Sequence, residues 1–429
     1  MNNEQTASPN YKWIALLLLW VAFFLQQGTR QIYSATLPSI GASFGFPPDK
    51  IGKEMGVVAT VFTFMYGICV PFAGIAADLF RRKWMVTIGV AVFCCGIFCS
   101  GFVGTLGLLI VTYGVLNGLG QTFYYPSATS LISQLHKDTR ATALSLLQVG
   151  LYLGIIGCSW ASGWMAEGGT EGWRTPFWLF GGIGLAWAVV LAFTLKDTKP
   201  VPATGAPQKA SVGEAVKAMM GKPSALLLAL GFGMMVYVDS GFKTWMPDYL
   251  KTSTVFVSDF KAISDRLPWL KGAPALFAVV WHYLGALVGV MVASRVSDRF
   301  VKTRPGIRME MNIIGLAVAV PFIWWMAHAN TLVGCCVAMA LFGVFRGVYD
   351  SNLFASLFDV IKPRYHASAG GIMLCCAFIF GSSSSTVLGW MKQAFSMQTG
   401  LASLAGFYLA GALVILVARL CFLKRDYEK

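Results

Sequence analysis

Long apolar runs alternate with short polar segments along the whole chain of 429 residues. A helix needs about 20 residues to cross the hydrocarbon core of a bilayer, and the runs reach or pass that length. The polar gaps between them are too short to form a soluble catalytic domain. The pattern predicts twelve membrane-spanning helices at 12–40, 51–79, 83–103, 106–135, 140–166, 174–195, 224–251, 273–297, 308–328, 331–361, 366–391 and 400–423.

One longer polar segment divides the spans into two groups of six. Residues 196–223 are rich in Lys and Pro, a composition that suits an extended linker and not a membrane span. We therefore expect an all-α membrane protein built as two six-helix bundles with a central cavity between them. The predicted domains are an N-terminal bundle at 1–195, a cytoplasmic linker at 196–223 and a C-terminal bundle at 224–429.

The composition agrees with a membrane protein, since 56% of the residues are hydrophobic and only 12% are charged, against about 25% charged in soluble domains. The net charge of +14 comes from short basic clusters between the apolar runs. Such clusters are an orientation signal and do not form the basic stripe of a nucleic-acid-binding protein. We predict a monomeric, multi-pass protein of the inner (plasma) membrane with both termini in the cytoplasm. Its partners would be the lipid bilayer and a small solute, with no nucleic acid.

The ten cysteines lie inside the apolar runs and form no pair of C-x-x-C units, so we interpret them as small hydrophobic residues. The sequence has no phosphate-binding Gly-rich loop, no His/Cys/Asp metal set and no nucleophile motif. It therefore predicts no enzymatic activity, no cofactor and no metal.

A short motif repeats in the two halves. Gly74 to Lys83 follows the second span, and Ser294 to Lys302 follows the eighth; each has an acid at the end of a helix and then basic residues. An acid in this place can latch to neighbouring helices and be released when they rock, although a helix cap with orientation charges would look the same in one copy. Two copies in matching positions favour the latch, and paired halves with a site between them are a known transporter plan. The predicted latch residues are Asp78, Arg82, Asp298 and Arg299.

The same motif, the twelve spans and the central linker resemble the major facilitator superfamily. Further residues resemble its organic anion/cation symporter branch, which includes carriers of hexuronates, galactonate and sialic acid. The resemblance implies the two-bundle fold of that superfamily and transport by alternating access. The matching segments are Thr29–Arg30, Gly118–Gln121, Gly172–Phe177 and Trp245–Leu250.

Four positions depart from the pattern of that branch, and one of them is Gly114 in the fourth span, where the branch has an Arg. Its symporters commonly carry an acid where this chain has Thr29 and a Glu where it has Gln121. The organophosphate carriers have a second Arg where this chain has Asp239. The departures argue against the usual proton route of the branch and against phosphate-type substrates.

Five charged residues fall at mid-membrane, where a charge costs roughly 2.5–3.5 kcal/mol on insertion scales. Asp239 and Lys243 are spaced i, i+4 in the seventh span, and Arg346 and Asp350 are spaced i, i+4 in the tenth. This spacing places each pair on one helical face. Arg30 has no such acid, so the sequence predicts an anionic ligand as its partner; bonds to helix carbonyls or to Asp350 are the alternative.

Other polar residues at mid-span complete the candidate site, although each could instead form an interhelical hydrogen bond. The candidates for proton coupling are Asp350, Asp239 and His282. The candidates for substrate binding are Arg30, Gln27, Tyr33, Tyr66, Gln121, Tyr124, Gln148, Lys243, Arg346, Tyr349 and Asn352.

These residues predict a secondary transporter of a small organic anion, such as a hexuronate, an aldonate or sialic acid, in symport with protons or sodium. An uncoupled facilitator, an antiporter, a drug exporter and a membrane sensor with a transporter fold are the alternatives. The segment 252–272 carries charges and aromatic residues and predicts a short helix at the outer surface, which gates entry or covers the spans.

Overall fold

A computed structural model describes residues 11–47, 50–136, 138–196, 212–301, 303–304 and 306–427, and all regular elements in these ranges are helices. Twelve helices among the described residues are long and apolar enough to cross a membrane, as predicted. The elements are α1 (Tyr11–Ser43), α2 (Ile51–Leu79), α3 (Arg82–Ser100), α4 (Leu106–Leu109), η1 (Ile110–Asn117), α5 (Gly118–Leu135), α6 (Arg140–Ala166), α7 (Arg174–Thr194), α8 (Val212–Met220), α9 (Pro223–Thr252), α10 (Val257–Arg266), η2 (Pro268–Leu270), α11 (Ala273–Phe300), α12 (Ile307–Ala327), α13 (Leu332–Phe358), η3 (Pro363–Tyr365), α14 (His366–Ser382), α15 (Ser384–Ala394), α16 (Met397–Val417), η4 (Ala418–Phe422) and α17 (Leu423–Asp426).

Two spans are less regular than the sequence indicates. The fourth consists of α4, η1 and α5, and η1 is a π-helix in the first half of the span. The eleventh is interrupted at Ser383, between α14 and α15. π-Helical turns are often associated with functional sites, and η1 supplies two residues of the site described below. The short helix predicted within 252–272 is present as α10.

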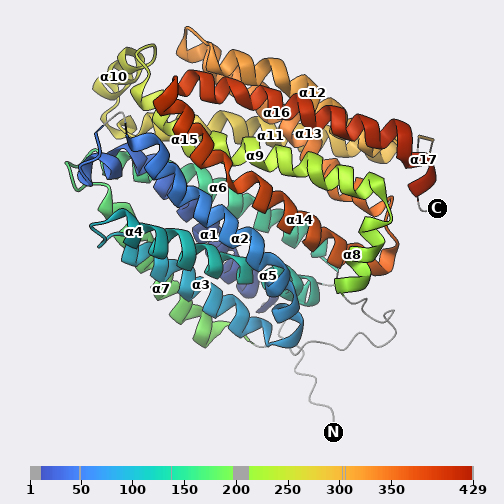
Figure 1. The fold of residues 1–429 in the computed structure, drawn as a ribbon. Coiled ribbons are helices and arrows are strands. Elements are labelled where there is room, and N and C mark those ends of the chain that lie inside the picture. The colour runs from blue at the N-terminus through green and yellow to red at the C-terminus, as the bar shows by residue number, and fades with distance from the viewer. Residues whose placement is uncertain are drawn as a thin grey trace.

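The helices form two bundles that lie side by side (Figure 1). In the N-terminal half α1 packs on α6, and α3 packs on α5 and α7; in the C-terminal half α13 packs on α11 and α12, and α12 packs on α16. The halves meet where α2 runs along α14 and α15, where α6 meets α11 and where α1 meets α9. Residues 197–211, most of the predicted linker, lie outside the described residues, so its predicted bounds stay a prediction.

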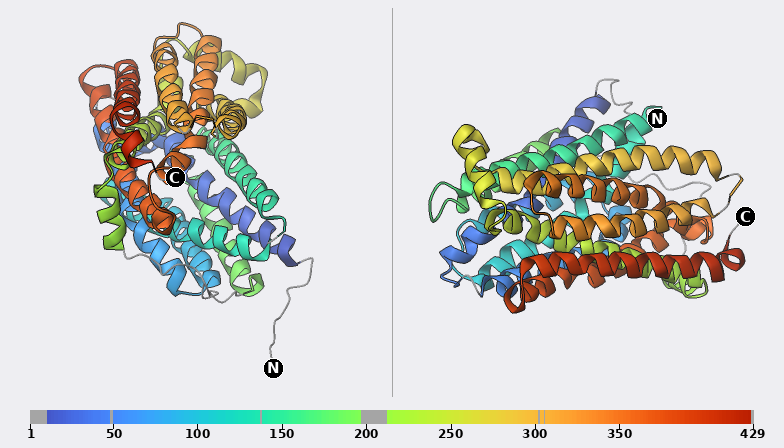
Figure 2. Two further views of the ribbon diagram at one scale, coloured as in Figure 1. Left: turned by 90° about the vertical axis from the view of Figure 1, so that its right-hand side faces the viewer. Right: turned by 90° about the horizontal axis from the view of Figure 1, so that it is seen from above.

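The molecule has two distinct ends along the direction of the spans (Figures 1 and 2). We call the end where α1 begins and α17 ends the termini end, and the opposite end, which carries α10, the α10 end. Because the number of spans is even, the start of the first helix and the end of the last lie at the same end. This geometry holds whichever side of a membrane that end faces.

Polar contacts join the halves at the α10 end. The Lys251 Nζ lies 2.6 Å from a carboxylate oxygen of Glu167, and the Trp160 indole N–H donates to the carbonyl of Trp269 at 3.1 Å. Nearby, Gly52 of α2 and Gly389 of α15 approach so closely that a methyl group on either would overlap the carbonyl oxygen of the other. The halves are therefore closed against each other at the α10 end.

Candidate functional site

Arg30 lies in the middle of α1 and is held by hydrogen bonds from the fourth span. Its Nε donates to Oε1 of Gln121 at 2.5 Å. The Gln121 amide nitrogen in turn donates to Oδ1 of Asn117 at 2.7 Å, which turns the amide oxygen toward the guanidinium. The Tyr113 hydroxyl donates to the backbone carbonyl of Arg30 at 3.0 Å. The π-helix η1 provides both Tyr113 and Asn117, so the irregular turn helps to build this scaffold.

The guanidinium of Arg30 lies beside two aromatic rings but is not neutralised. Its Cζ lies 4.5 Å from the ring centroid of Tyr66 and 5.6 Å from that of Phe62, distances at which an aromatic face attracts a cation. Among the described residues, its Nη2 is buried without a hydrogen-bond partner, and no acid forms an ion pair with Arg30. The fork of Nη atoms is thus the part of Arg30 left for a ligand.

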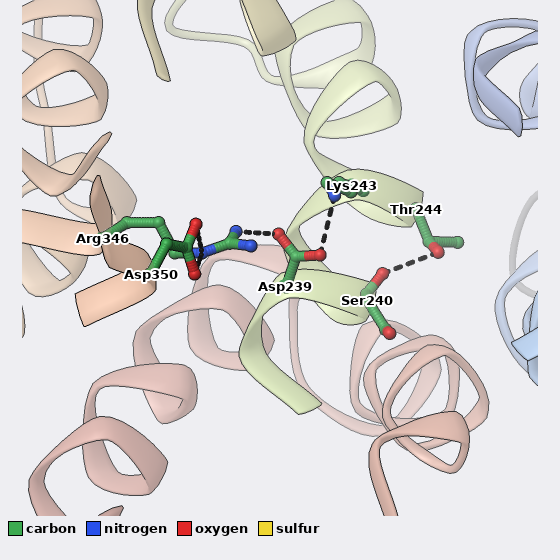
Figure 3. A network of polar contacts seen from close by, with 6 residues as sticks. All are labelled: Asp239, Ser240, Lys243, Thr244, Arg346 and Asp350. Carbon is green, nitrogen blue, oxygen red and sulfur yellow. Dashed lines mark hydrogen bonds and ion pairs between the residues drawn. The ribbon is translucent and has the colours of Figure 1, made fainter. Parts of the chain in front are cut away.

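The C-terminal half contributes four charged side chains that form one network (Figure 3). The two ion pairs expected from spacing are present: Lys243 Nζ lies 2.7 Å from Asp239, and Arg346 Nε lies 3.1 Å from Asp350. A bond between Arg346 and Asp239 joins the two pairs across α9 and α13. Two acids and two bases of this half therefore compensate each other.

The four network residues differ in how far they are open to solvent. The side chains of Arg346 and Asp239 are 12% and 16% exposed, whereas those of Lys243 and Asp350 are 27% and 36% exposed. Among the described residues, Asp350 also has a single ion-pair partner, while Asp239 has two. Asp350 is thus the acid of the network that solvent reaches most easily.

A cavity of ≈ 80 Å³ lies between the two halves, space for roughly six water molecules. Of the residues predicted for substrate binding, it is lined by Gln27, Arg30, Tyr33 and Lys243, and the predicted proton site Asp239 also faces it. The remaining wall is made mostly of polar and aromatic side chains from both halves, with two aliphatic ones: Gln31, Ser34, Ala59, Phe62, Thr63, Tyr113, Ile155, Ser240, Thr244 and Phe378.

Several predicted residues lie elsewhere. The Tyr124 hydroxyl is buried and donates to the carbonyl of Leu19, which ties α5 to α1. The buried amide of Asn352 accepts from Ser297 at 2.5 Å and donates to the Val348 carbonyl at 3.1 Å. These two side chains serve contacts between and within helices, so we leave them out of the site proposed below.

Three further predicted residues, Tyr349, His282 and Gln148, do not line the cavity. Tyr349 is fully buried in the C-terminal half. His282 is also fully buried, with its ring 5.0 Å from Phe242 and 4.6 Å from Phe342 between centroids. Gln148 lines a different groove, of ≈ 420 Å³ between α5 and α6, together with Arg140.

Comparison with known proteins identifies the family. The family profile described as Major Facilitator Superfamily matches residues 19–386. This chain belongs to the major facilitator superfamily. The family is one of membrane transporters, and the twelve-helix, two-bundle fold agrees with this membership.

The relatives of this superfamily member are distant in sequence. "Protein spinster homolog 1" of Xenopus laevis is 23% identical over 388 residues, which cover 87% of this chain and 72% of that protein. The "Probable sulfoacetate transporter SauU" of Cupriavidus necator is 24% identical over 418 residues, covering 92% and 90%. The "Probable anion transporter 1, chloroplastic" of Oryza sativa subsp. japonica is 24% identical over 428 residues, covering 96% and 77%.

Solved structures confirm the fold of this major facilitator protein. A bacterial homolog of the human lysosomal transporter Spinster, in an inward-facing and unoccupied conformation, matches with a TM-score of 0.80 at 18% identity, covering 98% of this chain and 99% of that one. The nucleoside transporter NupG matches with a TM-score of 0.72 at 16% identity, covering 94% and 98%.

The predicted latches of this superfamily member lie at the termini end. Arg82 is buried at the start of α3, while the side chain of Asp78 lies outside the part that the structure describes. In the second copy Asp298 and Arg299 are exposed, and neither forms an ion pair with the described residues. Arg308 and Asp359 make a 2.6 Å ion pair at that end instead. The latch role stays a prediction.

Sequence reasoning missed a further charged pair inside the bundle. Asp248 is buried, and Lys392 of α15 lies 2.6 Å from its carboxylate. In the sequence, Asp248 entered only as part of the segment Trp245–Leu250, and Lys392 was given no role. The signal was present, because Asp248 stands in an apolar run and needed a basic partner.

Proposed function

We propose that this protein is a secondary transporter that moves a small organic anion across the membrane by alternating access, with the anionic group held by Arg30. The observation that carries the proposal is the uncompensated guanidinium in the central cavity. Arg30 is positioned by a neutral amide, its Nη2 is without a partner in the described structure, and the acids nearby are engaged by Lys243 and Arg346. An Arg fork is well suited to a carboxylate or sulfonate.

The cavity lining and the relatives support a polar anion as substrate. The amide and hydroxyl groups of Gln27, Gln31, Ser34 and Ser240 face the space beside Arg30, whereas a drug exporter would need a more apolar wall. Two relatives are named for anion or sulfoacetate transport. We propose short sulfonates and sugar acids, such as hexuronates, aldonates and sialic acid, as the first substrates to test.

The experiment is uptake into liposomes that contain the purified protein. Labelled sulfoacetate, a hexuronate and a neutral hexose would be compared, with protein-free liposomes as the control. We expect saturable uptake of an anion and none of the neutral sugar. Uptake of the neutral sugar alone would remove the basis for an anion at Arg30, and binding without any uptake would favour a membrane sensor.

We also propose Asp350 as the site where a proton binds, with sodium as the alternative coupling ion. It is the most exposed acid of the network, and Arg346 is its single ion-pair partner among the described residues, so protonation would release Arg346 from one of its two acids. For any anion that the wild type concentrates, Asp350→Asn should abolish accumulation but leave counterflow exchange. Unchanged accumulation in both Asp350→Asn and Asp239→Asn would remove both acids from the coupling route.

His282 is the third candidate for this role, but it does not line the cavity. In the plasma-membrane orientation that we propose, both termini are cytoplasmic and the α10 end is external. The structure would then be closed to the outside. Labelling of single cysteines introduced on α10 and on α17 of a variant without the ten native cysteines, in intact cells and in inside-out vesicles, tests this orientation.

A further inference from the structure

The charges at the centre of the molecule do not cancel. Arg30, Lys243 and Arg346 are basic, and Asp239 and Asp350 are acidic, so the empty site carries one positive charge in excess. The next pair along α9, Asp248 with Lys392, is neutral as a unit and lies nearer the α10 end. Within the described spans, the imbalance at the centre is therefore a single unit.

The other titratable groups that face the four-residue network add no charge to this count. They are tyrosines, which are uncharged near neutral pH, and His282, whose ring nitrogens have no partner among the described residues and no acid in contact. The groups around Asp350 are Arg346 and Tyr349 on α13, Asp239 and Lys243 on α9, Tyr408 on α16 and Tyr152 on α6. His282 and Tyr283 on α11 lie near the other three members of the network.

A transporter of this kind must close its cavity at both ends during each cycle. Closure removes bulk water, and an unbalanced charge away from water is strongly unfavourable unless a partner compensates it. Among the ligand-bound forms, the balanced one therefore closes most readily, and the return of the ligand-free site, with its one excess charge, is the slower half of the cycle. A bound anion and a bound proton both change that balance.

A second anionic group has a place in the same cavity. Lys243 lines it from α9, opposite Arg30 on α1, and is held by Asp239, which also has Arg346 as a partner. A ligand with two anionic groups can bind Arg30 with one and Lys243 with the other, while Asp239 keeps Arg346. Such a ligand brings the total to one negative charge, which one proton on Asp350 cancels.

We propose that the cavity closes over a ligand only when its charges sum to zero, so the charge of the ligand sets the number of protons carried with it. A monoanion then moves with no proton, and a dianion moves with one. This inference rests on the proposed anion transport. It makes one protein a uniporter or exchanger for some substrates and a proton symporter for others.

The test uses two sulfonates of similar size that differ in charge. Isethionate has an alcohol where sulfoacetate has a carboxylate, so they are a monoanion and a dianion near neutral pH. Labelled uptake and internal pH are recorded together in proteoliposomes at zero membrane potential. We expect no proton per isethionate and one per sulfoacetate. Accumulation of sulfoacetate should rise about tenfold per unit of pH difference, and that of isethionate should not change.

Variants that remove one charge from the site should change the number of protons carried per ligand by one. Lys243→Gln removes a base, so isethionate uptake should gain one proton, whereas the matched control Lys243→Arg should leave it at none. If Lys243→Gln does not fold, Asp239→Asn serves in its place and should carry sulfoacetate without a proton.

The outcomes separate the inference from the function on which it rests. If the wild type moves neither of the two sulfonates and no sugar acid, the proposed function and the charge rule are both overturned. Uptake with a proton accompanying isethionate, or equal proton counts in Lys243→Gln and Lys243→Arg, overturns the charge rule alone.

Discussion

Replacing Arg30 tests the central claim most directly. In Arg30→Gln the side chain keeps polarity but loses its charge. Two unit charges about 4 Å apart at an effective dielectric constant near 20 attract by about 4 kcal/mol, and part of that is offset by the lost hydration of the ligand. A charge-assisted hydrogen bond contributes a net ~1.5–3 kcal/mol. We therefore expect a loss of about 3 kcal/mol, or roughly 10²-fold in affinity.

Arg30→Lys separates charge from geometry. Lysine keeps the positive charge but has neither the planar fork nor the Nε–H that Gln121 holds at 2.5 Å, so we expect an intermediate loss of about tenfold. Arg140→Gln is the matched control, since it removes an exposed arginine of the same half that lines the separate α5–α6 groove.

The assay is equilibrium binding of a labelled anion to protein in lipid nanodiscs, with thermal unfolding recorded for each variant. An Arg30→Gln protein that unfolds like the wild type and binds within about threefold of its affinity would refute the assignment. A loss in Arg140→Gln as large as that in Arg30→Gln would show that overall charge, and not this site, controls binding.

Three further outcomes are expected. Gln121→Glu places a carboxylate on the guanidinium of α1, so anion binding should weaken at neutral pH and recover on acidification, as measured by binding between pH 5 and 8. Glu167→Gln removes the half-exposed ion pair with Lys251, and such pairs contribute ~0.2–1 kcal/mol. The population of the form open at the α10 end, measured from spin-label distances across that end, should therefore rise by at most about fivefold. Arg174 and Ser43 hold the pKa of Glu171 below its usual range. The stability that the Glu171 carboxylate contributes is therefore present above the pKa that Glu171 has in the unfolded chain, and it is lost as pH falls through the lower pKa of the folded state. Between pH 5 and 3 the wild type should therefore lose more melting temperature than Glu171→Gln.

The spans were predictable because a helix that crosses a lipid bilayer must be predominantly apolar along its whole length. That requirement is visible in any window of about 20 residues. The pairs Asp239–Lys243 and Arg346–Asp350 were predictable for a similar reason, since i, i+4 neighbours on one helix are fixed by its geometry. The bond that joins Arg346 to Asp239 connects residues 107 positions apart, and no local spacing indicates it.

The direction of single polar side chains was harder to predict. A helix inside a bundle faces both the cavity and its neighbours, so a polar residue at mid-span suits either side. Tyr124 and Asn352 turned out to contact other helices, while Gln121 holds Arg30 from behind. The π-helix η1 adds to the difficulty, because it shifts the helical period just before the residues that support the site.

The glycine contact between α2 and α15 links the effect of a single substitution to one conformation of the transport cycle. Gly52 and Gly389 leave no room for a methyl group only while the halves touch at the α10 end. Alanine at either position acts as a wedge that penalises this one conformation and leaves the opposite one unaffected. The fitness cost of that single carbon atom, measured across growth conditions, would report how much time the carrier spends shut on that side.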